Sequence, residues 1–308
     1  MTYTGTDPRS TLPSTDPPRP DSCADPQFFE FNRLRPDEVT AIGSRSWYVR
    51  GQNFTLGYTM AKAGESLHRH DQPDEYMIVL PDGGASAVVH GAGQSTVIDG
   101  AAVVVVPPGN SSIDIAADTV VVRLLSSCSP DLLAASRNTD AYAQPDPNVA
   151  PFTPWPAAPG GAHVRVYRIN DYPYAAGRFG RIFRCSTFMV NFFDPDLGPR
   201  DPGALSPHSH PDFEQISLVT DGEYAHHIRV PWGVDRAHWR EDTHHRCGSP
   251  SLAVIPPPTE HTSQSLGQVR NHLIDIFCPP RTDFSLREGW VLNAADYPMP
   301  DIDDDDHS

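Results

Sequence analysis

The stretch HSHPDFEQISLVTDGE, residues 208–223, decides the fold, because a close copy of it, HRHDQPDEYMIVLPDGG, stands at residues 68–84. Each copy has a His-x-His pair, three or four residues that include a proline, a glutamate, an apolar run and an Asp-Gly turn. Further along, each copy has a valine-containing run that closes in proline, GAAVVVVPPGNSS in the first and GSPSLAVIPPPTEH in the second. Two copies at this distance indicate a duplicated domain rather than a solenoid.

The apolar runs around these copies have the length and spacing of β-strands. They are short, and Gly, Pro and Asp interrupt them at intervals of about 8 to 12 residues, as is typical of strands. The 308 residues include 33 Pro and 22 Gly, which favours turns over long helices. We therefore predict an all-β protein with only short helices.

The sequence divides into four segments. Residues 1–30 are rich in Pro, Asp, Ser and Thr and are expected to form a flexible N-terminal arm. Residues 31–135 and 163–308 are expected to form two similar domains, the second of which ends in the acidic tail IDDDDHS. A Pro-rich linker, residues 136–162, joins them. The stretch DLLAASRNTDAYA, residues 131–143, spans the boundary between the first domain and the linker and can form a short helix.

The charge balance excludes some classes of partner. With 23 basic and 39 acidic residues the formal net charge is −16, and Lys62 is the only lysine. Counterion release from nucleic acid or an anionic membrane needs basic clusters, which this sequence lacks. There is no apolar leader or membrane-length apolar run, and the five cysteines form no CxxC pair. We expect a cytoplasmic protein whose partner is a small molecule.

The second copy has the spacing of a metal site. Side chains two apart on a strand point the same way, so His208 and His210 converge. Pro211 favours a turn that brings Glu214 beside them, and His261 can supply a fourth ligand. Three imidazoles and a carboxylate suit a divalent transition metal such as Fe, Mn, Ni, Cu or Zn.

These motifs resemble the cupin superfamily, whose two signatures are G(x)5HxH(x)3,4E(x)6G and G(x)5PxG(x)2H(x)3N. Because both halves match, the sequence looks like a bicupin, which implies two double-stranded β-helix (jelly-roll) barrels. The resemblance places metal ligands at His208, His210, Glu214 and His261. The second half departs modestly from the signatures at Gly203, Gly222, Pro258 and Ser265.

The first half departs where a ligand should stand. Ser112 occupies the position of the second-motif histidine, and a hydroxyl is a poor transition-metal ligand. His68, His70 and Glu75 could still form a degenerate two-histidine, one-carboxylate site, but we favour a structural role for this barrel.

Pairing across the Asp-Gly turns suggests further site residues. If Asp221-Gly222 closes a two-residue hairpin, Arg229 lies opposite Glu214, and His227 lies on the same face of the sheet. Arg229 could then hold a substrate carboxylate, or it could pair with Glu214, or both side chains could point outward. The same pairing in the first half puts His90 opposite Glu75 as a replacement ligand.

The insertion PWGVDRAHWREDTHHRCG, residues 231–248, joins two strands of the second barrel. It is either a lid whose underside carries Trp232 and Trp239, or an exposed loop in which His244 and His245 have no role.

The resemblance implies several functions. The first is an Fe- or Mn-dependent dioxygenase for a small enolic or carboxylate-bearing molecule, with Glu214, Arg229 and His227 as catalytic residues. The alternatives are a non-oxidative isomerase, lyase or decarboxylase, and a non-catalytic small-molecule-binding cupin. No helix-turn-helix accompanies the barrels, which argues against a transcription factor. An unpaired sheet edge would favour a homo-oligomer, although the duplicated chain can satisfy barrel pairing internally.

Overall fold

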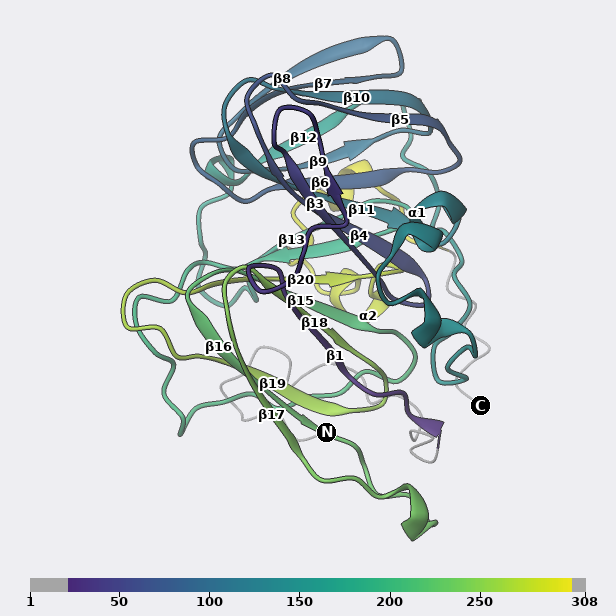
Figure 1. The fold of residues 1–308 in the computed structure, drawn as a ribbon. Coiled ribbons are helices and arrows are strands. Elements are labelled where there is room, and N and C mark those ends of the chain that lie inside the picture. The colour runs from purple at the N-terminus through teal and green to yellow at the C-terminus, as the bar shows by residue number, and fades with distance from the viewer. Residues whose placement is uncertain (1–21, 301–308) are drawn as a thin grey trace.

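The structure is a computed structural model that describes residues 22–300. Four β-sheets are stacked in layers, two for each half of the chain, as Figure 1 shows. The acidic tail from residue 301 and the first 21 residues of the predicted arm lie outside the described residues. The prediction of an all-β fold with short helices is confirmed.

The N-terminal barrel consists of two sheets. Its outer N sheet has the order β5 (Ser66–Gln72), β10 (Gly109–Ile115), β7 (Ser86–Gly91) and β8 (Gln94–Asp99). Its inner N sheet has the order β12 (Arg165–Arg168), β9 (Ala102–Val106), β6 (Tyr76–Leu80), β11 (Thr119–Ser126), β4 (Phe54–Ala61), β3 (Arg45–Arg50) and β2 (Glu38–Val39).

The C-terminal barrel repeats this plan. Its inner C sheet has the order β1 (Gln27–Glu30), β18 (Ser251–Ile255), β15 (Gln215–Asp221), β20 (His272–Phe277), β14 (Met189–Phe192) and β13 (Arg181–Arg184). Its outer C sheet has the order β17 (Thr243–Gly248), β16 (Glu223–Arg229) and β19 (Glu260–Ser265). The helices are short: α1 (Pro130–Ala135), α2 (Thr282–Ser285), and the 3-10 turns η3 (Thr139–Tyr142), η4 (Ile169–Asp171), η5 (Arg236–His238) and η6 (Ala294–Asp296).

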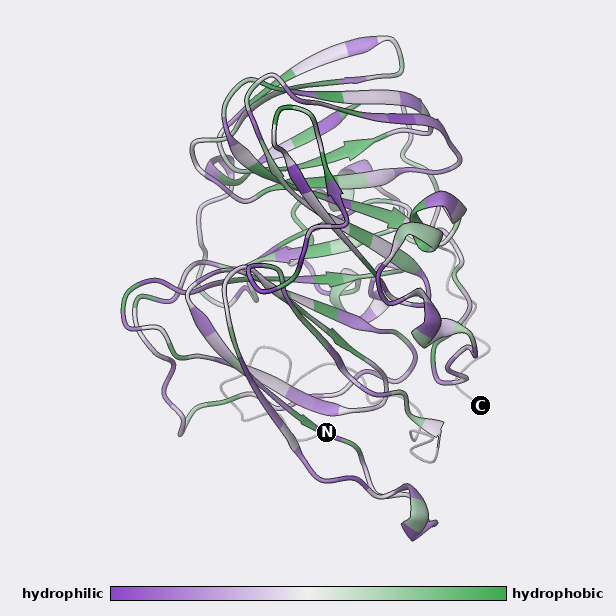
Figure 2. Cartoon of the chain, in the orientation of Figure 1, coloured by the Kyte–Doolittle hydropathy of each residue, from purple (hydrophilic) through white to green (hydrophobic). Residues whose placement is uncertain are grey.

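The two inner sheets pack against each other and share the largest hydrophobic core. Alternate residues of β6 divide between two cores: Ile78 faces the interior of its own barrel, while Met77 and Val79 face the other barrel. On the opposite side Ile216 and Leu218 of β15 belong to the same shared core. Because both faces of the inner sheets are buried, some of their strands, such as β6 and β9, are continuously apolar. Figure 2 shows green segments concentrated in these inner sheets. Barrel pairing is therefore satisfied within one chain.

The two halves exchange strands at the edges of the inner sheets. β1 pairs with β18 of the C-terminal barrel, and β12 pairs with β9 of the N-terminal barrel. Phe28 packs on the C-terminal barrel's own core, whereas Phe29 packs on the shared core. The end of the predicted flexible arm is therefore an ordered strand, because its two phenylalanines have apolar surfaces to cover.

The Asp-Gly turns do not close hairpins, which corrects the predicted pairing. β15 pairs with β18 and β20, while β16 pairs with β17 and β19, so Asp221-Gly222 carries the chain from the inner to the outer C sheet. Gly222 has a φ of 84°, and a Cβ there would lie 2.3 Å from Oδ1 of Asn271. The turn needs glycine for both reasons. In the first half β6 and β7 likewise belong to different sheets.

Candidate metal centre

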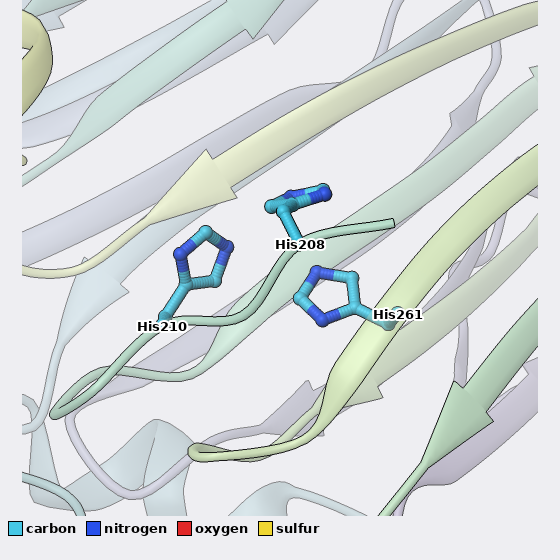
Figure 3. A group of neighbouring side chains, drawn as sticks. All are labelled: His208, His210 and His261. Carbon is cyan, nitrogen blue, oxygen red and sulfur yellow. The ribbon is translucent and has the colours of Figure 1, made fainter. Parts of the chain in front are cut away.

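Three buried histidines of the C-terminal barrel come together at the predicted place. His208, His210 and His261 are 7, 3 and 2 % exposed, and their ligand atoms all lie within 4.8 Å of one another. Figure 3 shows two rings rising from the segment before β15 and the third from β19. Among residues 22–300 this is the one group of three or more His, Cys, Asp or Glu residues with such a geometry.

Backbone pairing brings the three rings together. The amide of His208 donates to the carbonyl of His261 at 3.0 Å, and the amide of His261 donates back at 2.7 Å. This antiparallel bridge sets the two residues side by side, and His210 follows two residues later. Carbonyl oxygens lie 3.1 Å from Nδ1 of His208, on Ser206, and 3.1 Å from Nδ1 of His261, on Thr259. Such contacts orient metal-binding imidazoles in proteins.

Gln215 completes the group, and the sequence analysis missed it. Its Oε1 lies 2.8 Å from Nε2 of His210 and 3.3 Å from Nε2 of His261. Its amide nitrogen donates to Oγ of Ser217 and to Oδ1 of Asp275, at 3.0 and 3.1 Å. These two acceptors require the amide oxygen to face the histidines.

The donor set fits a divalent transition metal. Both ring nitrogens of His261 face oxygen acceptors, on Thr259 and Gln215, but a neutral imidazole carries only one N–H. A cation among the Nε2 atoms and the amide oxygen would satisfy every one of these acceptors. Three imidazoles and one carbonyl oxygen are suitable ligands for ions such as Fe or Mn. His208, His210, His261 and Gln215 are therefore the residues that would hold the ion.

Glu214 lies outside this group, which corrects its sequence-based assignment as a ligand and a catalytic residue. One carboxylate oxygen accepts from the amide of Gln52 at 2.6 Å, and the other accepts from the hydroxyl of Tyr142 at 2.8 Å. Burial raises the pKa of Glu214 to about 7, against the opposing effect of these two hydrogen bonds. Glu214 thus ties the C-terminal barrel to the other half of the chain.

The alternation of side chains along the strand explains why Gln215, and not Glu214, lies beside the histidines. Glu214 shares a face with Ile216 and Leu218, which point into the core between the barrels. Gln215 shares the opposite face with Ser217, toward the histidines. The alternation of polar Gln215 and Ser217 with apolar Ile216 and Leu218 was a signal in the sequence that could have identified the fourth site residue.

Arg229 and His227 point outward, which was one of the open alternatives. Arg229 is paired in the ladder with Glu260, and its guanidinium is held by Asp242 at 2.6 Å, on the surface. Nδ1 of His227 lies 2.8 Å from Nδ1 of His244 on the same outer face. Neither side chain reaches the histidine group, so their assignment as catalytic residues beside the metal is corrected.

His226, the neighbour of His227, points inward instead. It is 1 % exposed, and its Nδ1 lies 2.8 Å from Oγ of Ser263 on the strand that carries His261. Burial lowers the pKa of His226 to about 3. A neutral imidazole therefore lies in the barrel interior. Assigning the other face of this strand to the interior would have placed His226 there from the sequence.

The structure separates the residues of the predicted degenerate site. His68 and His70 point the same way, as predicted, but they are exposed, while Arg69 between them is buried. His90 is bound to Asp114 on the same outer surface.

Glu75 faces the opposite direction, into the C-terminal half. Its carboxylate accepts from the hydroxyl of Ser186 at 2.6 Å. It is therefore the counterpart of Glu214, and each barrel sends one buried glutamate into the other half of the chain. Because Glu75 faces away from the exposed His68 and His70, the structure does not bring the residues of the alternative degenerate site together, and it agrees with the favoured structural role of this barrel.

No protein-family model and no curated protein matches this sequence. Solved structures do match. The oxalate decarboxylase of Lactobacillus farciminis, determined as a formate complex, has a TM-score of 0.53 at 14 % identity, over 82 % of this chain and 86 % of that one. An 11S allergen from Cocos nucifera has a TM-score of 0.51 at 12 % identity, over 83 % and 89 % of the two chains.

The chain has the bicupin fold. At such identities the likeness concerns the fold alone, and the titles of the two matching structures name an enzyme and an allergen, so the bicupin fold does not choose a function. No helix in the described part of this bicupin is long and apolar enough to cross a membrane. All five cysteines are free.

Proposed function

We propose that this bicupin is an Fe- or Mn-dependent dioxygenase that acts on a small organic molecule bearing an enol or a carboxylate. The observation that carries the proposal is the cluster of three buried imidazoles, two of which lie beside the amide oxygen of Gln215. When bound there, such an ion supplies a Lewis acid for the substrate and redox chemistry toward dioxygen.

The charge of the ligand set supports an anionic substrate. Imidazole and amide ligands are neutral, so the charge of a divalent ion is left uncompensated by His208, His210, His261 and Gln215. A carboxylate or enolate would supply the missing negative charge.

The chain's own residues keep the site in one geometry. Asp275 accepts from both Gln215 and Ser217, which fixes the amide that faces the histidines. His226 stays neutral above its lowered pKa, so its ring carries one N–H donor and one acceptor nitrogen in the barrel interior.

Metal content tests the proposal first. Elemental analysis of protein purified without chelator should give about one Fe or Mn per chain, because the four ligands form a single site. The double variant His208→Ala/His261→Ala should lose that metal. The matched control is His68→Ala/His70→Ala, which removes the other His-x-His pair from the exposed face of β5 and should retain the metal.

Oxygen uptake with enolic and carboxylate compounds then tests the reaction. Uptake by the wild type and by the control variant, but not by the metal-free variant, supports a dioxygenase. Turnover without oxygen consumption contradicts the dioxygenase and indicates non-oxidative chemistry. A wild type that binds no metal even after reconstitution contradicts the enzyme proposal as a whole.

A further inference from the structure

The connection between β16 and β17 projects from the C-terminal barrel, as Figure 1 shows, and a groove of about 860 Å³ lies along it. A smaller depression of about 220 Å³ continues from this groove and shares Arg229, Asp242 and His244 with it. The depression is also lined by His261, one of the three histidines of the candidate metal centre. The depression therefore lies on the outer face of the outer C sheet, where His227 and Arg229 point, whereas the buried ring of His261 faces the barrel interior.

The groove has an aromatic wall. Trp232 and Trp239 stack with ring centroids 4.3 Å apart and an interplanar angle of 4°. Trp239 is fixed by a hydrogen bond from its Nε1 to the carbonyl of Gly233 at 2.9 Å. Trp232 uses one ring face for this contact and remains 68 % exposed. An aromatic ring stacked on a fixed neighbour and open to solvent suits a planar ligand.

The groove contains one arginine whose guanidinium has no partner among residues 22–300. Arg229 is paired with Asp242, and Arg240 binds Asp25 and the carbonyl of Cys23. The guanidinium of Arg236, on η5, has no hydrogen bond or ion pair to any residue in the described range 22–300, while the Arg236 carbonyl accepts from the amide of Trp239.

Charge complementarity in the groove therefore favours an anion. Its lining contains three arginines against two carboxylates, those of Glu241 and Asp242. This excess of positive charge stands out in a chain whose net charge is −16. Because guanidinium matches a carboxylate in shape and charge, Arg236 is the residue that would bind one.

We propose that this groove is a binding site for an aromatic carboxylate, with the ring stacked on Trp232 and the carboxylate bound by Arg236. A volume of about 860 Å³ accommodates a small organic molecule. The inference goes beyond the proposed function and does not depend on it, because the groove is lined by none of the four residues of the candidate centre. On this proposal the projecting segment forms a ligand-binding wall on the surface of the barrel.

Calorimetric titration of the full-length protein with three probes tests the site. Benzoate should bind in the millimolar range or tighter, while cyclohexanecarboxylate, which lacks the aromatic face, and benzyl alcohol, which lacks the charge, should each bind at least fivefold more weakly. Trp232→Ala and Arg236→Gln should each weaken benzoate binding fivefold to tenfold. Both side chains are exposed, so the variants should keep the wild-type melting temperature.

Matched controls lie on the projecting segment and on the adjoining strand β17. Val234→Ala changes a fully exposed apolar residue that does not line the groove, and Arg246→Gln changes an exposed arginine paired with Glu223. Both should bind benzoate as the wild type does.

The variant His208→Ala/His261→Ala separates this proposal from the proposed function. It should still bind benzoate within twofold of the wild-type affinity while containing no metal. Absence of benzoate binding in a wild type that holds its metal would overturn the groove proposal alone. Equal binding of all three probes would overturn the assigned ligand chemistry. A wild-type dimer that becomes monomeric on Trp232→Ala would show that the tryptophan pair is an interface between two copies, and would also overturn the proposal.

Discussion

Gln215 is the residue that distinguishes the candidate centre from the cupin signature. A glutamate is the cupin signature residue at the metal, and the neighbouring glutamate of this sequence, Glu214, belongs to the opposite strand face. The centre is thus neutral, and its fourth donor is oriented by Asp275 rather than by its own charge.

The effect of charge at Gln215 can be tested by Gln215→Glu. The new carboxylate would face Asp275, which now accepts a hydrogen bond from the Gln215 amide. Loss of that donor and the repulsion between two buried carboxylates should lower the unfolding free energy of metal-free protein by about 1–3 kcal/mol. Urea denaturation measures it. The double variant Gln215→Glu/Asp275→Asn restores a donor and should recover most of the loss, whereas equal stability of wild type and Gln215→Glu would contradict this role of Asp275.

We expect the buried side chain of His272 to make the stability of the protein depend on pH. Burial, aided by nearby Arg270, lowers the pKa of His272 from 6.5 to about 4, and the neutral ring contacts Thr220 and the carbonyl of Phe193. Because the unfolded chain binds this proton more readily, the stabilisation is fully present above pH 6.5. It is lost as the pH falls toward 4, by at most about 1.4 kcal/mol per pH unit.

The variant His272→Gln isolates this contribution. Denaturation curves measured between pH 7 and pH 4 should show a shallower loss of stability than those of the wild type. Identical slopes for the two proteins would mean that His272 does not contribute to acid lability.

At the scale of elements, strand β1 closes the edge of the C-terminal barrel although it comes from the N-terminal end of the chain. Phe28 stacks on His245 with centroids 4.0 Å apart and packs against Ile228, Ala253 and Ile255. The ladder pairs of β1 with β18 anchor the strand, and the phenylalanine covers the interior behind it.

Phe28→Ala should therefore destabilise the protein. Because the ring is only partly buried, we expect a loss of about 1–2 kcal/mol, below the usual 3–5 kcal/mol for a fully buried phenylalanine. Thermal and urea denaturation measure the loss. Val39→Ala on the exposed edge strand β2 is the control and should change stability by less than about 0.5 kcal/mol. A similarly small effect of Phe28→Ala would show that β1 does not stabilise the barrel.

At the scale of the whole molecule, the two barrels are expected to unfold together. They share the core between the inner sheets, exchange β1 and β12, and each inserts a buried glutamate into the other half. Leu218, fully buried in that core, contacts both halves through it. Separating the two barrels from each other would expose the entire apolar surface of this shared core.

Calorimetry of Leu218→Ala tests this expectation. The variant should lose about 2–5 kcal/mol and unfold in one transition, shifted as a whole, because the cavity weakens a core that both barrels need. Leu286→Ala, at a leucine that is 57 % exposed, is the control and should leave the transition in place. Two separate transitions, only one of them shifted, would show that the barrels fold independently.

The sequence by itself determined the fold class, the duplication and three of the four centre residues. The reason is that these depend on local spacing. His208 and His210 are two residues apart, and residues with that separation keep a common direction whatever the strand pairs with. His261 followed from its place after the second proline-closed run.

Only the tertiary structure decided which face of each strand points toward the site. Glu214 and Gln215 are adjacent and point to opposite faces of the strand. One face meets Gln52 and Tyr142 from the other half of the chain, and the opposite face meets the histidines of the same barrel. Arg229 and His90 were misplaced because the Asp-Gly turns change sheet, and a turn's residues do not reveal which sheet the next strand joins. The local pattern thus fixed which residues could bind a metal, while packing between the barrels fixed which of them do face the site.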